Sequence, residues 1–233
     1  MIYLHRDTLR RNKWEVGMLE MIFGLASFLI AAFAFGFGAV KLFRKKKPLY
    51  LQLLVCAAGC FALQQLSYIV NLWCGVTAVV STGMLGILGC NFFLLSANFG
   101  TLDRLVDEGT GTKKLRLLAA AAPIGAAALA AAAFLAWKDR DLFCGTVWLV
   151  MLLPALPASY FNLKHILLPM DPFEFLRATR PCNIAALVFY GVAAVYVVAA
   201  ARDRAVGLLS VLMSLSVLSL TLCAVKGAKR WGI

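Results

Sequence analysis

Polar side chains that could bind a ligand gather in one apolar stretch of the chain, residues 49–73. Five of them fall within eight positions: Gln64, Gln65, Ser67, Tyr68 and Asn71. Positions 64, 67, 68 and 71 share one face of a helix, because residues three and four apart lie on the same side. These side chains form hydrogen bonds without carrying a charge. The spacing therefore predicts an uncharged hydrogen-bonding surface.

Residues with the same chemistry occur in four other apolar stretches: Asn91, Tyr160, Tyr190 and Ser214. Together with the five above, they are candidates to line a mid-membrane cavity for a neutral or zwitterionic small molecule. The alternative is that they only join helices, since Ser, Asn and Gln do so at about 0.6–2 kcal/mol per hydrogen bond. The group at 64–71 is the hardest to assign to packing, because one helix contact needs fewer polar residues.

Chemistry that requires an acid, a base or a metal has no evident site. The two histidines, His5 and His165, are too few for a three-histidine zinc centre. No Asp or Glu falls in the middle of an apolar stretch, which disfavours proton relays and cation pumps. Phosphate-binding glycine loops and the HExxH motif are also missing from the sequence. We therefore predict no catalytic residue, no metal and no cofactor, and an enzyme is the least favoured function class.

The elements that must position these residues are seven apolar stretches that occupy most of the chain. Crossing the hydrocarbon core of a bilayer takes about 20 apolar residues in a helix. Hydrophobic residues make up 62% of the chain and charged residues 15%. We expect an all-α protein, a polytopic bundle of seven transmembrane helices in one domain over residues 18–229, with a cytoplasmic tail at 230–233. The predicted spans are Met18–Leu42, Leu49–Trp73, Val76–Phe99, Leu118–Trp137, Thr146–Leu168, Cys182–Ala201 and Val206–Ala228.

Basic residues indicate the orientation of these spans. The net charge is +12, and the Lys and Arg residues lie mostly in the connections, where they meet anionic headgroups. This distribution predicts the lipid bilayer as the main partner and argues against nucleic acid. Because cytoplasmic loops retain positive charge, we expect the C-terminus inside and the N-terminus outside. Tryptophans at the expected outer boundary support the same register: Trp73, Trp137 and Trp148. A bacterial cytoplasmic membrane is the expected location.

The first 17 residues do not fit this orientation well. They carry four basic residues, Arg6, Arg10, Arg11 and Lys13, on the predicted outer side. A short basic tail resists translocation. Either the natural start is Met18 and residues 1–17 lie upstream of it, which we favour, or the tail lies flat on the membrane surface.

Prolines and small residues single out two of the spans. Pro154 and Pro157 each remove a hydrogen bond from the predicted fifth span, and broken helices mark many transport sites, although a simple kink is the alternative. The fourth span is almost entirely alanine, so it is either a tightly packed central strut or a spacer. Pro181 is expected to end a short surface helix before the sixth span.

Two cysteines, Cys74 and Cys144, fall in predicted outer connections. Disulfides persist in an oxidising compartment, so we predict a bond between them, provided that their Cα atoms lie within about 7 Å. The alternative is two free thiols.

Transport of the small molecule is the function that these patterns favour. The alternative is a seven-helix ligand sensor, or a membrane subunit that signals through a separate partner protein. The N-out, C-in topology matches that of seven-helix receptors, but topology alone is an analogy.

The predicted topology can be tested with reporter fusions. A reporter placed after Lys229 is expected to be cytoplasmic, and one placed before Met18 is expected to be on the outer side, because an odd number of spans separates them. Activity of both reporters in one compartment would contradict the seven-span bundle.

Overall fold

The computed structural model describes residues 2–43, 48–74, 84–102, 113–138, 140–168, 175–202 and 206–230. Within these ranges every regular element is a helix and none is a strand. The elements are α1 (Ile2–Leu42), α2 (Leu49–Trp73), α3 (Met84–Leu95), the π-helix η1 (Ser96–Leu102), α4 (Lys113–Ala119), α5 (Ala121–Lys138), α6 (Leu142–Leu152), α7 (Ala155–Leu167), α8 (Phe175–Ala200) and α9 (Val206–Arg230).

Among the described residues, six helical segments are long and apolar enough to cross a membrane. Consecutive helices form two of them, α4 with α5 over Lys113–Lys138 and α6 with α7 over Leu142–Leu167. A shorter apolar helix occupies Met84–Phe99, where the sequence predicts the third span, and the first residues of that span lie outside the described part of the chain. The prediction of an all-helical membrane bundle is therefore confirmed. Its orientation stays a prediction.

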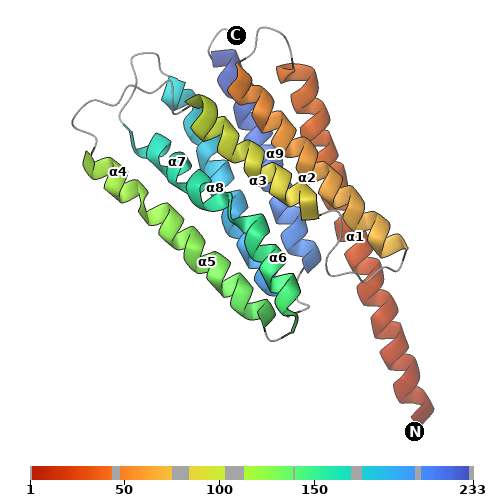
Figure 1. Cartoon of the computed structure of the whole chain (residues 1–233). Helices are drawn as coiled ribbons and strands as arrows, with labels where there is room; N and C mark the ends of the chain where they lie inside the picture. The colour runs from red at the N-terminus through yellow and green to blue at the C-terminus, as the bar shows by residue number, and fades with distance from the viewer. Residues whose placement is uncertain are drawn as a thin grey trace.

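The first helix, α1, continues without interruption from Ile2 to Leu42. Its first part projects beyond the bundle, and the start of α1 and the end of α9 lie at opposite ends of the molecule (Figure 1). The two alternatives for residues 1–17, a natural start at Met18 or a tail that lies flat on the membrane surface, stay predictions.

The helices pack as two groups that share α8. On one side α1, α2 and α9 pack together, and α9 packs against α8. On the other side α5 packs against α6, α7 and α8, and α7 also packs against α8 (Figure 1). The helix α3 joins the two groups, because it packs against α2, α6 and α7. Phe61 of α2 meets Phe189 of α8 edge to face, with ring centroids 5.5 Å apart. This edge-to-face geometry is the one that aromatic rings prefer. The core therefore lies where α8 meets both groups.

Large apolar side chains cover the outside of the bundle on every long span. A water-soluble protein rarely exposes so much contiguous apolar surface. Lipid chains are as apolar as these side chains, so a bilayer accommodates this surface without cost. Representative exposed residues are Leu29, Leu63, Ile124, Val150, Val188 and Leu215.

The alanine-rich helix α5 lies along one edge of the bundle (Figure 1). Ala130, Ala133 and Trp137 are its buried residues, whereas Ile124 and Leu135 are exposed. A central strut would be buried on several faces. The structure therefore favours the spacer alternative for this span.

Two of the three tryptophans face the protein, and one proline differs from its predicted role. Trp73 is 81% exposed, whereas Trp137 and Trp148 are 6% and 5% exposed, and the depth of all three in the membrane stays a prediction. Trp137 lies inside the bundle because its indole N–H donates to the Val197 carbonyl, 3.0 Å away. Pro181 does not end a helix, because α8 continues through it. Proline early in a membrane helix is tolerated where neighbouring groups satisfy the carbonyl that it frees.

Glycines allow α2 and α3 to approach closely, and this contact gives a test of the packing. A Cβ atom on Gly86 would lie 2.5 Å from the Cys60 carbonyl oxygen, whereas one on Gly36 would meet nothing within 4 Å. Gly86→Ala is expected to destabilise the protein by about 1–3 kcal/mol through overpacking. The matched Gly36→Ala should be neutral or stabilising, because alanine favours helix by about 1 kcal/mol. Thermal unfolding in detergent measures both, and equal midpoints would contradict this packing.

Candidate functional site

The predicted fifth span is broken into α6 and α7 at Leu153 and Pro154. Neither Pro154 nor Pro157 has an N–H to donate to the carbonyl four residues before it. The residue that precedes each proline compensates: Leu153 donates to the Val150 carbonyl at 3.3 Å, and Leu156 donates to the Leu153 carbonyl at 3.1 Å. The chain tightens locally as a result, and a turn at Leu153 and Pro154 separates α6 from α7 within one span. Both residues keep right-handed helical dihedral angles, and the Leu153 N–H also donates to the Leu149 carbonyl at 3.1 Å.

A cavity of about 230 Å³ lies beside this break, between α5 and α8. We call it the α5–α8 cavity. Leu152 and Ala155 border it on either side of the break, and Tyr190 lies on its α8 wall. The remaining lining residues are Ala122, Gly125, Ala126, Leu129, Ala130, Leu156, Ser159, Leu187, Gly191 and Ala194.

Glycines keep this cavity open. A Cβ atom added to Gly125 of α5 or to Gly191 of α8 would meet nothing within 4 Å. Side chains on the two walls are therefore too short to meet. Ser159 directs its hydroxyl to the Leu156 carbonyl, 2.7 Å away, and not into the cavity. The walls consequently present carbon atoms almost everywhere.

A buried polar network lies behind the α8 wall. The Tyr190 hydroxyl accepts a hydrogen bond from the Asn162 amide at 3.4 Å. Asn162 accepts one from the amide of Asn98 at 2.8 Å, and the oxygen of Asn98 lies 3.3 Å from Nδ1 of His165. The network joins η1, α7 and α8. Asn98, Asn162 and His165 are at most 1% exposed, so these bonds are shielded from water.

Of the residues in this network, only Tyr190 is predicted as a site residue from the sequence. Asn162 and His165 are three residues apart on α7, a spacing that places them on one helix face. That signal was available, but the same face also bears Ala158 and Phe161, whose apolar side chains obscure it. Asn98 lies in a π-helix, whose extra residue per turn changes the side chain that faces α7. A regular helical projection misses that change.

Two predicted residues, Gln64 and Gln65, form a separate cluster between α2 and α9. Gln65 donates to the side-chain oxygen of Gln64 at 2.9 Å, and Ser210 donates to the oxygen of Gln65 at 2.9 Å. Ser214, also predicted, donates to the Ser210 carbonyl at 3.0 Å. These groups satisfy one another across the helix contact. The geometry favours packing over ligand binding for this cluster.

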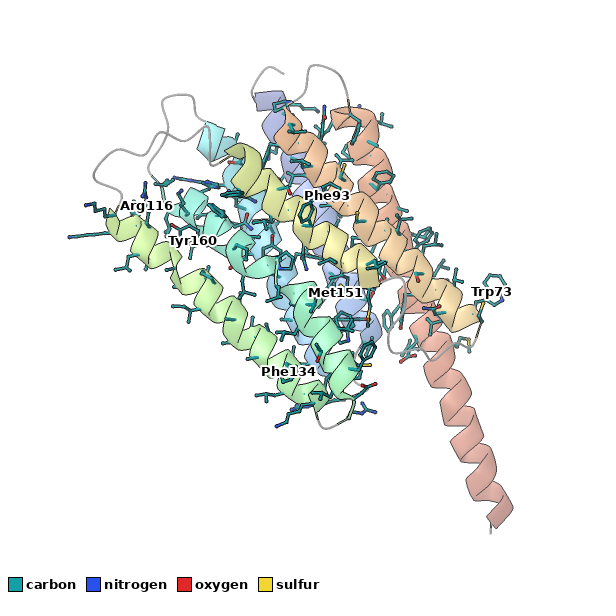
Figure 2. The ribbon with its side chains drawn as sticks, viewed as in Figure 1. Trp73, Phe93, Arg116, Phe134, Met151 and Tyr160 are labelled. Atoms are coloured by element: carbon teal, nitrogen blue, oxygen red, sulfur yellow. The ribbon has the colours of Figure 1, made fainter. Side chains whose placement is uncertain are left out.

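Asn91 of α3 lies at a third place, against the end of α6. Its amide donates to the Met151 carbonyl at 2.9 Å, so Asn91 ties α3 to the last turn before the break. Met151 lies near the centre of the bundle (Figure 2). The side-chain oxygen of Asn91 is buried and has no hydrogen-bond partner among the described residues.

The other predicted residues do not join these clusters. Ser67, Tyr68 and Asn71 are partly buried near the end of α2, and the ring of Tyr68 packs beside Gly24 of α1. Tyr160 lies on the flank of α7 that faces α4, with its ring 5.3 Å from that of Phe161 (Figure 2). The structure thus distributes the nine predicted residues over several helix contacts and does not gather them around one cavity.

The predicted bond between Cys74 and Cys144 is not present, because all seven cysteines are free thiols. Cys74 is exposed, whereas Cys144 is buried and its thiol donates to Oδ2 of Asp141 at 2.9 Å. Asp141 caps α6 by also accepting from the Cys144 N–H at 3.1 Å. These hydrogen bonds lower the pKa of the Asp141 carboxyl. The thiol of Cys144 therefore has a capping partner in place of a second cysteine.

Metal chemistry finds no support in the part of the chain that the structure describes, which contains no group of three or more His, Cys, Asp or Glu side chains placed to hold an ion. Comparison with known proteins does not assign a family either: no family model, no curated protein and no solved structure matches the chain. The candidate site therefore has to be judged on its geometry.

The packing role of the glutamine cluster predicts measurable coupling between α2 and α9. In a double-mutant cycle with Gln65→Leu and Ser210→Ala, we expect a coupling energy of about 0.6–1.7 kcal/mol, the range found for hydrogen bonds between membrane helices. Unfolding in mixed micelles measures it. As a control, Gln65→Leu paired with Thr221→Val should be additive, because Thr221 donates within its own helix. Additivity of both pairs would contradict the interhelical bond.

Proposed function

We propose that the protein is a membrane transporter whose substrate places an apolar portion in the α5–α8 cavity. The observation that carries this proposal is the position of the cavity at the break between α6 and α7, where Leu152 and Ala155 line it from both sides. Interrupted helices beside a mid-membrane cavity are a recurring feature of transporters.

The break supports movement because it separates two short helices. Across Pro154 the regular hydrogen bond from residue 154 to residue 150 is missing. A change in the angle between α6 and α7 therefore costs less than bending an intact helix. Such a change would alter the cavity directly, since both helices contribute to its wall.

The buried network offers a way to couple the cavity to other helices. Tyr190 contacts the cavity and bonds to Asn162, which in turn bonds to Asn98 in η1. π-helical segments occur frequently at functional sites. If α7 shifts during transport, these hydrogen bonds either break or move α8 and η1 together with α7. The three helices would therefore move as a coupled unit.

The residues that line the cavity limit the chemical class of the substrate. None of its lining residues is charged, and the hydroxyl of Ser159 is engaged by the backbone. A sugar or amino acid would lose hydrogen bonds to water without replacing them, which costs several kcal/mol. The part of the substrate that enters is therefore apolar and uncharged, in contrast to the polar ligand that the glutamine-rich surface of α2 suggests.

Proteoliposomes that contain the purified protein provide the test. We expect flux of amphipathic or hydrophobic fluorescent probes, including lipids labelled on one chain, above that of protein-free liposomes. In Pro154→Ala/Pro157→Ala the restored N–H groups should join α6 to α7. If the break permits the rate-limiting movement, flux should fall about tenfold, which corresponds to a barrier only 1.4 kcal/mol higher.

Pro48→Ala is the matched control. Pro48 is the N-cap of α2 and does not line the cavity, and no helical hydrogen bond requires an N–H at that position, so flux should be unchanged. If the double variant folds and transports at the wild-type rate, the break is not the moving part. Saturable probe binding without flux would contradict transport and favour the seven-helix sensor.

A further inference from the structure

The α5–α8 cavity opens sideways toward the bilayer. Gly125 and Leu129, on its α5 wall, are exposed, whereas Ala130 and Tyr190 are buried. Exposed residues in the middle of a membrane span face lipid chains. The cavity therefore runs from the lipid-facing surface inward to α8, and a molecule dissolved in the bilayer reaches it without crossing water.

The depth of the cavity matches the inner part of one leaflet. Ala126, near the centre of the α5 wall, follows Arg116 by ten residues, which is about 15 Å along a helix. The hydrocarbon core of a bilayer is about 30 Å thick, so one leaflet contributes about 15 Å. A lipid with its headgroup at the level of Arg116 thus has the end of its acyl chain beside the cavity.

The size of the cavity indicates that it holds only part of a ligand. Its volume of about 230 Å³ lies below the range of about 300–1,000 Å³ that encloses a drug-sized molecule. A hydrocarbon chain fits this constraint, because one segment of the chain occupies the cavity while the rest remains in the bilayer. The carbon walls need no hydrogen-bonding partner from such a segment.

Charge at the start of the same span favours an anionic headgroup. Lys113 and Lys114 are exposed at the first residues of α4, and Arg116 follows on the same helix (Figure 2). No acidic residue occurs in either α4 or α5. Basic residues at the membrane surface attract anionic lipids with about 1 kcal/mol each.

We infer that a bilayer lipid with an anionic headgroup binds along α4 and α5, its headgroup at Lys113 and Lys114 and the end of one acyl chain in the α5–α8 cavity. The inference rests on the proposed function only in identifying this lipid as the substrate class. Binding itself follows from the lateral opening, the depth, the carbon walls and the charge.

Electron paramagnetic resonance tests the binding independently of flux. The full chain is reconstituted in phosphatidylcholine with a trace of phosphatidylglycerol spin-labelled near the end of one chain, or with phosphatidylcholine labelled in the same place. We expect a larger motionally restricted fraction for phosphatidylglycerol. Lys113→Gln/Lys114→Gln should reduce this preference at least about fivefold, the equivalent of one lysine's attraction.

Two variants fill the cavity from opposite walls. Gly125→Leu and Gly191→Leu add side chains into open space, so both should fold and both should lower the restricted fraction of either labelled lipid. Gly36→Leu, on α1, also adds a side chain into open space and should leave the restricted fraction unchanged. An unchanged restricted fraction in both cavity variants would overturn the inference, as would equal restriction of the two wild-type lipids.

The outcomes separate this inference from the proposed transport. A restricted phosphatidylglycerol population that disappears in Gly125→Leu, together with absent flux, supports the lipid site and contradicts transport. Probe flux with no restricted lipid population contradicts the lipid site and leaves transport standing.

Discussion

A polypeptide in a bilayer must satisfy its backbone hydrogen bonds without water, and the rest of this structure depends on that requirement. In the described part of the chain helices meet it, and prolines remove the N–H groups that some of their bonds need. At Pro154 and Pro157 the carbonyls of Val150 and Leu153 are taken by the residues that precede each proline. This local solution divides one span into α6 and α7. The cavity lies at the same place because its wall changes from one helix to the other there.

The same requirement applies to side chains and explains why the cavity is apolar. Gln65 accepts a hydrogen bond from Ser210 across the α2–α9 contact, and Asn98 donates one to Asn162 across the η1–α7 contact. Each pairing removes donors and acceptors from any surface that a ligand could reach. What remains between α5 and α8 is a surface mostly of alanine, glycine and leucine, with Ser159 and Tyr190 beside them. The polar residues that looked most like a binding site thus build the scaffold, and the apolar helix supplies the site.

The spans could be predicted from the sequence because length and apolar composition are local properties. The partners of polar residues are not local. Gln64 and Tyr68 share a face of α2, yet Gln64 lies against Gly86 of α3 and Tyr68 beside Gly24 of α1, since neighbouring helices divide that face. In a regular helix, a spacing of seven residues would place Asn98 on the same face as Asn91, but Asn98 lies in the π-helix η1 and donates to Asn162. Trp137 and Trp148 look like boundary residues, yet they are buried because α8 packs against them. These facts come from packing, which one sequence does not specify.

The alanine-rich composition of α5 determines the shape of the cavity wall. Small residues usually let helices approach closely. Here α5 lies at the edge of the bundle, and Gly125 faces Gly191 across open space instead of a neighbouring backbone. In water, such an apolar cavity would stay empty and cost stability. In a bilayer the surrounding solvent is hydrocarbon, and a lateral opening admits it. Short side chains on α5 therefore produce a surface that is complete only when a lipid chain fills it, which makes the membrane both the solvent of this protein and the source of its ligand.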